Sequence, residues 1–215
     1  MEVLLCAATR YEIEPIVQYI ASEKLENINI LVTGIGLPAA TYQLTRNISQ
    51  RRPGLVIQAG IAGALDDSLQ LGEVVLVSSE CIGDLGVTEQ GQFKSVFDMK
   101  LVANNEYPWT NGLLVNDSRF LDTVGLRKVP GVTINEITTL PAKIDYYKNT
   151  LGAAIESMEG AALHYVGLME KIPFLQVRSL SNFAGERDKS KWVFKEAIEN
   201  LNKEVISIIS KFVRL

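Results

Sequence analysis

Histidine and cysteine are scarce in this chain. Its 215 residues include one histidine, His164, and two cysteines, Cys6 and Cys81. A histidine-rich metal site is excluded, and a Ser-His-Asp triad would have to use His164. Because neither cysteine has metal-ligand spacing, we expect two reduced core thiols and no bound metal. His164 lies in a helical pattern, where we expect a core or interface residue.

The chain also lacks an excess of positive charge and a long apolar run. Its 21 basic and 25 acidic residues give a net charge of −4 and are spread through the sequence. Without a basic stripe, nucleic-acid binding is not expected. The first six residues are apolar but have no cationic leader, and no apolar run is long enough to cross a bilayer. We therefore expect a cytoplasmic protein without membrane contact.

Strand and helix patterns alternate along the chain, which at this length predicts one domain over residues 1–215. Alternation of this kind indicates a mostly parallel sheet covered on both faces. The expected strands are residues 3–8, 28–33, 55–59, 73–79, 131–135 and 174–180. We expect one helix to start at Tyr11 and four others to cover residues 37–51, 142–148, 157–171 and 190–212. Residues 83–108 are rich in glycine, asparagine and charge, and we expect a long loop or an interface segment there.

A carboxylate and an amide are predicted to share one pocket. Glu159 stands among small and apolar residues, where an ionised side chain needs a hydrogen-bonding partner. A ligand that carries hydroxyls would provide one. Ser181 and Asn182 end the apolar run 174–180, and the carboxyl ends of strands are where open α/β sheets bind ligands. We therefore expect these residues to face the same ligand.

Several motifs resemble the nucleoside phosphorylase and nucleosidase superfamily. They are Ala7-Ala8 followed by Glu12, Thr33-Gly34-Ile35-Gly36, Ala59-Gly60-Ile61-Ala62-Gly63, Met158-Glu159 and Ser181-Asn182. The resemblance runs nearly end to end. It implies a three-layer α/β/α sandwich with a mixed, mostly parallel sheet, a small nucleoside substrate, no cofactor and a homodimer. We interpret the glycines at 34, 36, 60 and 63 as turn residues that let a sugar or base approach the backbone.

The resemblance assigns the chemistry of N-ribosidic bond cleavage to two carboxylates. Glu12 would be the general base that activates water, although its position also suits an acid at a helix start. Glu159 would accept hydrogen bonds from the two ribose hydroxyls, although a capping role after Ser157 is the alternative. Met158 would pack at the ribose, and Ala8 belongs to the same motif as Glu12. A glutamate near the anomeric carbon repels phosphate and favours water, while Arg10 leaves phosphorolysis open.

Asn182 replaces the aspartate that adenosine-type nucleosidases of the superfamily place at this position. A carboxylate can accept from the exocyclic amine of adenine, whereas a 6-oxopurine offers acceptors at O6 and N7 and calls for an amide NH2. Asn182 therefore indicates hypoxanthine or guanine. By position in the superfamily, Ile61 and Thr139 are further expected neighbours of the purine, with Asn135, Ile137 and Thr138.

Residues 185–192 resemble the tail of the futalosine-hydrolysing branch of the superfamily. That likeness implies release of hypoxanthine from futalosine, a step towards menaquinone. Futalosine carries a carboxyphenyl ketone on its 5′ side, which calls for a cation and an aromatic wall. Arg187, Lys189, Lys191 and Trp192 offer these types, although a solvated charge run is an equal alternative for each. Two other functions stay open: a methylthioadenosine/S-adenosylhomocysteine nucleosidase that tolerates asparagine, and a nucleoside-binding protein without turnover.

Overall fold

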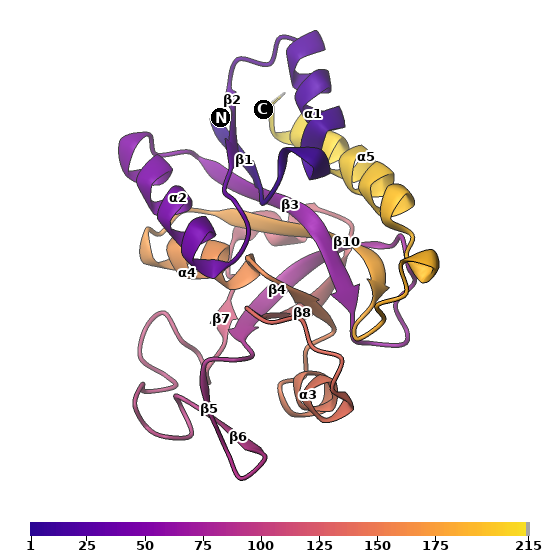
Figure 1. The fold of residues 1–215 in the computed structure, drawn as a ribbon. Helices are drawn as coiled ribbons and strands as arrows, with labels where there is room; N and C mark the ends of the chain where they lie inside the picture. Colours follow the sequence, from indigo (N-terminus) through magenta and orange to yellow (C-terminus); the bar gives the residue numbers. More distant parts are fainter. Residues whose placement is uncertain (214–215) are drawn as a thin grey trace.

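The computed structural model describes residues 1–213, which form a mixed sheet between two layers of helices (Figure 1). The strands are β1 (Val3–Ala7), β2 (Ile28–Val32), β3 (Leu55–Ala64), β4 (Val74–Ile82), β5 (Gly86–Glu89), β6 (Gln92–Ser95), β7 (Leu114–Val115), β8 (Arg127–Thr133), β9 (Ile155–Ser157) and β10 (Phe174–Phe183). The α-helices are α1 (Arg10–Ser22), α2 (Leu37–Gln50), α3 (Pro141–Asp145), α4 (Gly160–Met169) and α5 (Phe194–Val213). Residues Arg119–Thr123 and Lys189–Lys191 form short 3-10 helices, and Tyr146–Thr150 form a π-helical turn.

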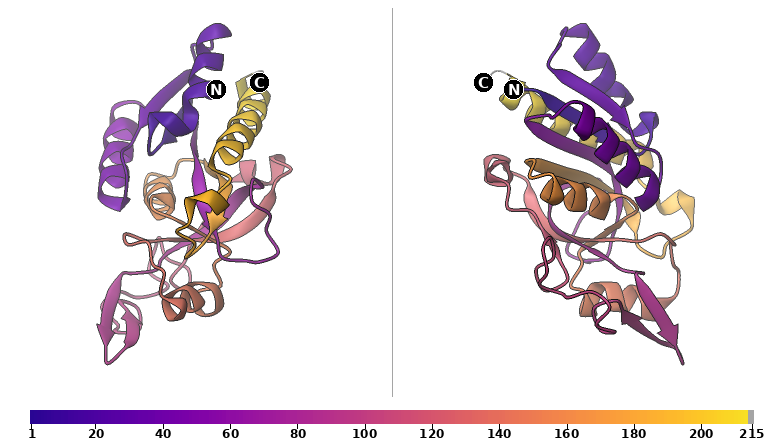
Figure 2. Two further views of the ribbon diagram at one scale, coloured as in Figure 1. Left: turned by 45° about the vertical axis from the view of Figure 1, so that its right-hand side comes forward. Right: turned by 90° about the vertical axis from the view of Figure 1, so that its left-hand side faces the viewer.

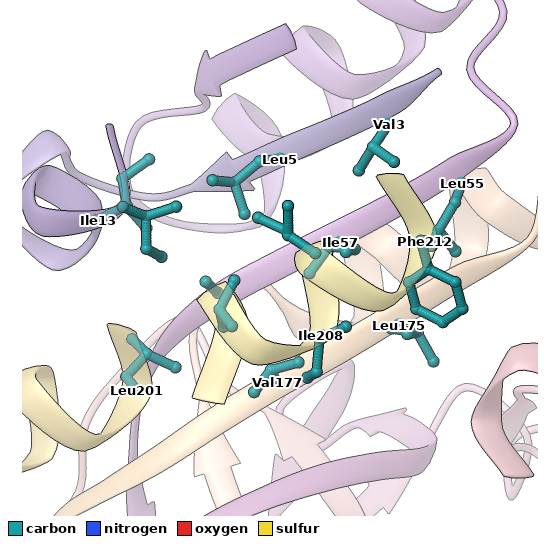
Figure 3. Packing of buried hydrophobic residues seen from close by; sticks show 14 of the residues in the cluster. Val3, Leu5, Ile13, Leu55, Ile57, Leu175, Val177, Leu201, Ile208 and Phe212 are labelled. Carbon is teal, nitrogen blue, oxygen red and sulfur yellow. The ribbon is translucent and has the colours of Figure 1, made fainter. Parts of the chain in front are cut away.

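Side chains that alternate along the strands explain the three layers. Val3 and Leu5 of β1 pack with α1 and α5 on one face of the sheet, whereas Leu4 and Cys6 pack with α2 and α4 on the other. Figure 2 shows the two helix pairs on opposite sides of the central strands. Figure 3 shows the first face, where Leu201, Ile208 and Phe212 of α5 lie against β1, β3 and β10. The predicted sandwich is confirmed.

The central sheet is mixed and mostly parallel, as predicted. Strands β2, β1, β3 and β10 are parallel neighbours, and so are β4, β8 and β9. Antiparallel pairs join β10 to β4 and β9 to β3, so five strands close into a ring from which β1 and β2 extend. This closure brings the ends of β3, β9 and β10 together.

Three expectations about local structure are corrected. The helix expected over 157–171 starts only at Gly160, because Ser157 is the last residue of strand β9, which pairs with β8 and β3. Residues 60–64 continue β3 instead of forming a turn, because β10 pairs with them. Within 83–108, residues 86–95 form the hairpin β5–β6, at the end of the molecule away from the two termini (Figure 1).

The scarce residues lie in the core. Cys6 and Cys81 are buried free thiols. His164 on α4 is fully buried, with Nδ1 at 2.9 Å from the Leu114 carbonyl oxygen and its ring edge against Phe174. Burial lowers the pKa of His164 to about 4, so the ring is neutral at pH 7. None of the helices within residues 1–213 combines the length and apolar character required to cross a membrane.

Candidate active site

A cavity of about 270 Å³ opens at the carboxyl ends of β1, β3, β9 and β10. Its wall combines apolar residues with carboxylates, an amide and a guanidinium group. The lining residues are Ala8, Thr9, Glu12, Ile35, Ile61, Ala62, Gly63, Ile134, Ile137, Glu156, Ser157, Met158, Glu159, Ser181, Asn182, Arg187, Trp192 and Phe194. The cavity therefore contains most of the residues that the motifs predict, drawn from both ends of the chain.

Glu12 lies in the first turn of α1 and is only 7% exposed. Its Oε2 accepts hydrogen bonds from the backbone N–H and the hydroxyl of Thr9, both at 2.9 Å. This is a capping interaction, so the helix-start interpretation is correct for one oxygen. Oε1 accepts a hydrogen bond from the backbone N–H of Ile61 on β3 at 3.3 Å. Glu12 thus has one oxygen bonded within its own helix start and one bonded to a residue of the cavity wall.

Glu159 is the N-cap residue of α4, yet its side chain makes no capping hydrogen bond to that helix. Its Oε1 accepts from the backbone N–H of Gly36 at 2.9 Å, which ties it to the loop before α2. Burial raises the pKa of Glu159, and the positive charge of Arg178 opposes that rise. The alternative, in which the Glu159 side chain caps α4, is therefore wrong.

Asn182 follows an irregularity in β10. The register against β3 shifts between Leu180 and Asn182, so Ser181 has no partner on β3 and both residues line the cavity. The Ser181 hydroxyl donates to Asn182 Oδ1 at 2.8 Å, and Asn182 Nδ2 donates to the carbonyl oxygen of Phe183 at 2.9 Å. These bonds fix the amide, while its second N–H stays available. Ser181 is buried, and Asn182 is half-buried rather than buried.

Not every predicted site residue reaches the cavity. Thr139 is exposed and absent from the lining, as is Lys189. Gly60 lies behind the wall inside β3, where a Cβ would stand 2.0 Å from Nη1 of Arg178 and 3.1 Å from Oε1 of Glu12. Gly60 is therefore needed for space and not for a turn. Gly36 has a φ of +88°, which does favour glycine.

A buried polar network behind the cavity was missed by the sequence interpretation. Arg178 is 1% exposed and donates to Gln58 Oε1 at 2.8 Å, and Gln58 Nε2 lies 3.4 Å from the Glu159 carbonyl oxygen. Glu80 accepts from Gln176 at 2.8 Å and from Thr133 at 2.9 Å. Burial raises the pKa of Glu80 to about 7, against these hydrogen bonds. The sequence did contain one signal of this network, which is the single arginine, Arg178, within the apolar run 174–180.

Three residues of the segment 187–194 line the cavity, and they are cationic or aromatic. The guanidinium carbon of Arg187 lies 5.7 Å from the ring centre of Trp192, and both residues line the cavity. Phe194, also in the wall, stacks on Tyr11 at 5.8 Å between ring centres. Lys191 is exposed and pairs with Glu186 at 2.6 Å, which matches the solvated alternative for that lysine.

The fold and this cavity define a class. The chain belongs to the phosphorylase superfamily, whose family model matches residues 16–214. The futalosine hydrolase of Thermus thermophilus is 32% identical over 185 residues, which cover 84% of this chain and 80% of that protein. A 5′-methylthioadenosine/S-adenosylhomocysteine nucleosidase of Tolumonas auensis is 27% identical, with 82% and 76% covered. The solved futalosine hydrolase of Helicobacter pylori superposes with a TM-score of 0.79 at 16% identity, over 98% of each chain.

Proposed function

We propose that this protein hydrolyses the N-ribosidic bond of futalosine and releases hypoxanthine, a step of menaquinone biosynthesis. The observation that carries the proposal is the meeting of Glu12, Glu159 and Asn182 around one cavity. The 32% identity to the futalosine hydrolase of Thermus thermophilus supports the choice of substrate. The three side chains match the three needs of the reaction, which are an activated water, a held ribose and a recognised base.

Glu12 is the proposed general base. Cleavage passes through a cationic, oxocarbenium-like sugar, which a water molecule attacks at the anomeric carbon. Because Thr9 holds Oε2, the carboxylate is oriented before the substrate arrives and Oε1 can accept the proton of that water. Arg10, which left phosphorolysis open, pairs with Glu14 at 2.5 Å on the exposed side of α1. This arrangement favours water over phosphate.

Glu159 is the proposed ribose ligand, with Met158 packed beside it. One oxygen is fixed by Gly36, so the carboxylate presents a defined edge to the vicinal hydroxyls. Its negative charge also stabilises the cationic sugar in the transition state. Burial makes this electrostatic effect larger than it would be in water.

Asn182 is the proposed purine reader, supported by Ser181, with Ile61 and Ala8 as neighbouring wall residues. Its free N–H would donate to O6 or N7 of a 6-oxopurine. On the 5′ side, Arg187 and Trp192 are proposed to hold the carboxyphenyl group, because they combine a cation with an aromatic face. Thr139 and Lys189 carry no role in this proposal.

The test is base release from purified protein in phosphate-free buffer, with futalosine, inosine and methylthioadenosine compared side by side. We expect hypoxanthine from futalosine at a rate that Glu12→Gln lowers by about 10²- to 10⁴-fold, the usual contribution of a general base. Glu14→Gln, two residues along on the exposed face of α1, is the matched control and should keep activity. Adenine release from methylthioadenosine alone would support the nucleosidase function instead, which the Tolumonas relative favours. Release of no base would favour a binding protein.

Three further expectations belong to this proposal. A single domain over 1–215 is supported by the continuous β1–β3–β10 core, which joins both ends of the chain. A homodimer is supported by exposed apolar side chains, namely Tyr165 and Met169 on α4, Tyr107, which hydrogen-bonds to α4, and Leu101. A cytoplasmic location fits a substrate of intermediary metabolism.

A further inference from the structure

Glu156 is a third carboxylate in the cavity wall, and the proposed chemistry does not use it. It lies on β9 and is 6% exposed. Its Oε2 is buried and accepts no hydrogen bond from any residue in the described part of the chain. A buried carboxyl oxygen without a partner costs free energy, which calls for an explanation. Glu156 also lines the cavity, where a ligand could supply a donor to its carboxylate.

The sheet register places Glu156 opposite Asn182. Gly63 of β3 pairs with Glu156 of β9 on one side and with Asn182 of β10 on the other. Residues in one cross-strand row project to the same side of a sheet, and two strand spacings separate their Cα atoms by about 10 Å. A Cβ on Gly63 would stand 3.0 Å from Glu156 Cγ and 3.1 Å from its Oε1, so the Glu156 side chain lies over this glycine, in the row that also contains Asn182. Both side chains line the cavity, where a flat ring could form a hydrogen bond with each of them.

The two side chains have complementary hydrogen-bonding character. Asn182 keeps one N–H for an acceptor, because its Oδ1 already accepts from Ser181. A carboxylate accepts only. A 6-oxopurine has acceptors at O6 and N7 and, next to O6, one donor, N1–H. Adenine has no hydrogen on N1 and offers an acceptor there. The pair therefore matches the 6-oxopurine edge and leaves adenine with an acceptor facing an acceptor.

We propose that Glu156 accepts the N1–H of the 6-oxopurine and, with Asn182, selects hypoxanthine over adenine. This inference rests on the proposed function, because it names the specificity determinant of the same site. Burial raises the pKa of Glu156 to about 7, with Arg187 opposing the rise, so an N–H donor would favour the ionised form. The side chain touches the base and not the reacting bond, which makes it a specificity residue.

The test measures the ratio of the dissociation constants of adenine and hypoxanthine by calorimetry. Glu156→Gln keeps the volume but presents an N–H, and Glu156→Leu removes all hydrogen-bonding atoms. We expect the wild-type preference for hypoxanthine to fall by about 10- to 100-fold in both variants, since a mismatched polar group is what rejects the wrong base. Glu199→Gln, at an exposed site on α5, is the control and should keep the ratio.

An unchanged ratio in both variants, or equal weakening of both bases, would overturn the inference, because a purely structural role affects both alike. A second measurement needs no variant: 1-methylhypoxanthine should bind the wild-type protein at least about tenfold more weakly than hypoxanthine. Equal binding of the two would also overturn it. Base release by the wild-type protein tests the proposed function separately, so an active enzyme whose ratio is unchanged disproves the inference alone.

Discussion

At the scale of single residues, a buried cation that acts on two buried carboxylates depends on one glycine. Arg178 opposes the rise in the pKa of both Glu159 and Glu80, and its Nη1 occupies the space where a Cβ at position 60 would lie. We predict that Gly60→Ala displaces the guanidinium group, lowers the free energy of unfolding by about 2 kcal/mol or more, and reduces base release. Gly125→Ala is the control, because nothing lies within 4 Å of a Cβ there. Equal denaturation midpoints for both variants would contradict this.

A second prediction at this scale concerns pH. The folded-state pKa of Glu80 is about 7, above the ordinary value of 4.5. A raised carboxyl pKa contributes stability below pH 4.5 that is lost as the pH rises through 7, by roughly 3 kcal/mol for this group. Glu80→Gln should remove that loss, so its stability relative to wild type should increase from pH 4.5 to 8. Urea unfolding across this range measures it, and parallel curves would show that Glu80 does not titrate there.

The sequence could predict that Glu12, Glu159 and Asn182 meet in one cavity, because each belongs to a motif with recognisable neighbours. Arg178 was also visible, as a charge inside the apolar run 174–180. Glu156 was hidden, since an acid three residues before Glu159 fits an exposed helical turn as well as a strand. Its burial comes from pairing with two strands that are distant in sequence, and local pattern does not contain that information.

At the scale of elements, α1 and α5 are joined at the turn that carries Glu12. Asn202 of α5 accepts from the backbone N–H of Ile16 at 3.1 Å and donates to the Glu12 carbonyl oxygen at 2.8 Å. In a regular α-helix the Ile16 N–H donates to the Glu12 carbonyl oxygen. Here the Asn202 amide bonds to both of these backbone groups and bridges them. Pro15 in the same turn already lacks an N–H.

We therefore predict that Asn202→Leu lowers the free energy of unfolding by about 1–3 kcal/mol and also reduces kcat, because the Glu12 turn loses its brace. Thermal unfolding and base release under substrate saturation measure the two effects. Lys203→Leu, an exposed neighbour on α5, is the control. A loss of stability with an unchanged kcat would show that Asn202 does not control the position of the Glu12 side chain.

Most elements could be predicted from periodicity, and the corrected ones share a cause. Strand β9 has three residues, too few to show a period of two. In β3, Gly60 and Gly63 look like turn residues, yet they are there because Arg178 and Glu156 occupy the space of a Cβ. Both cases depend on tertiary contacts that local propensity does not encode.

At the scale of the whole molecule, the outer side of α4 is the candidate dimer surface. Tyr107 donates to the Leu168 carbonyl oxygen, and the rings of Trp109 and Tyr165 lie 6.2 Å apart, so residues 107–109 cover part of α4. Met169, which follows Leu168 in the sequence, is exposed, and so is Leu101, which precedes Tyr107.

We predict that the wild-type protein sediments as a dimer and that Met169→Glu weakens association by at least about tenfold, because a charge would be buried in an apolar interface. Leu140→Glu, at an apolar site before α3 that is also exposed, should leave association unchanged. Sedimentation velocity at several concentrations measures both. A wild-type monomer at all concentrations would contradict the proposed dimer.

The bridge between Asn202 and Glu12 also has a consequence for biosynthesis. The two residues are separated by 190 positions, so the ribosome makes the brace long after it makes the turn that the brace holds. A nascent chain that has formed β1, β3 and α1 still has an unbraced Glu12 until α5 emerges and docks. Catalytic competence should thus appear at the end of synthesis rather than gradually, and partial products of translation should not consume substrate.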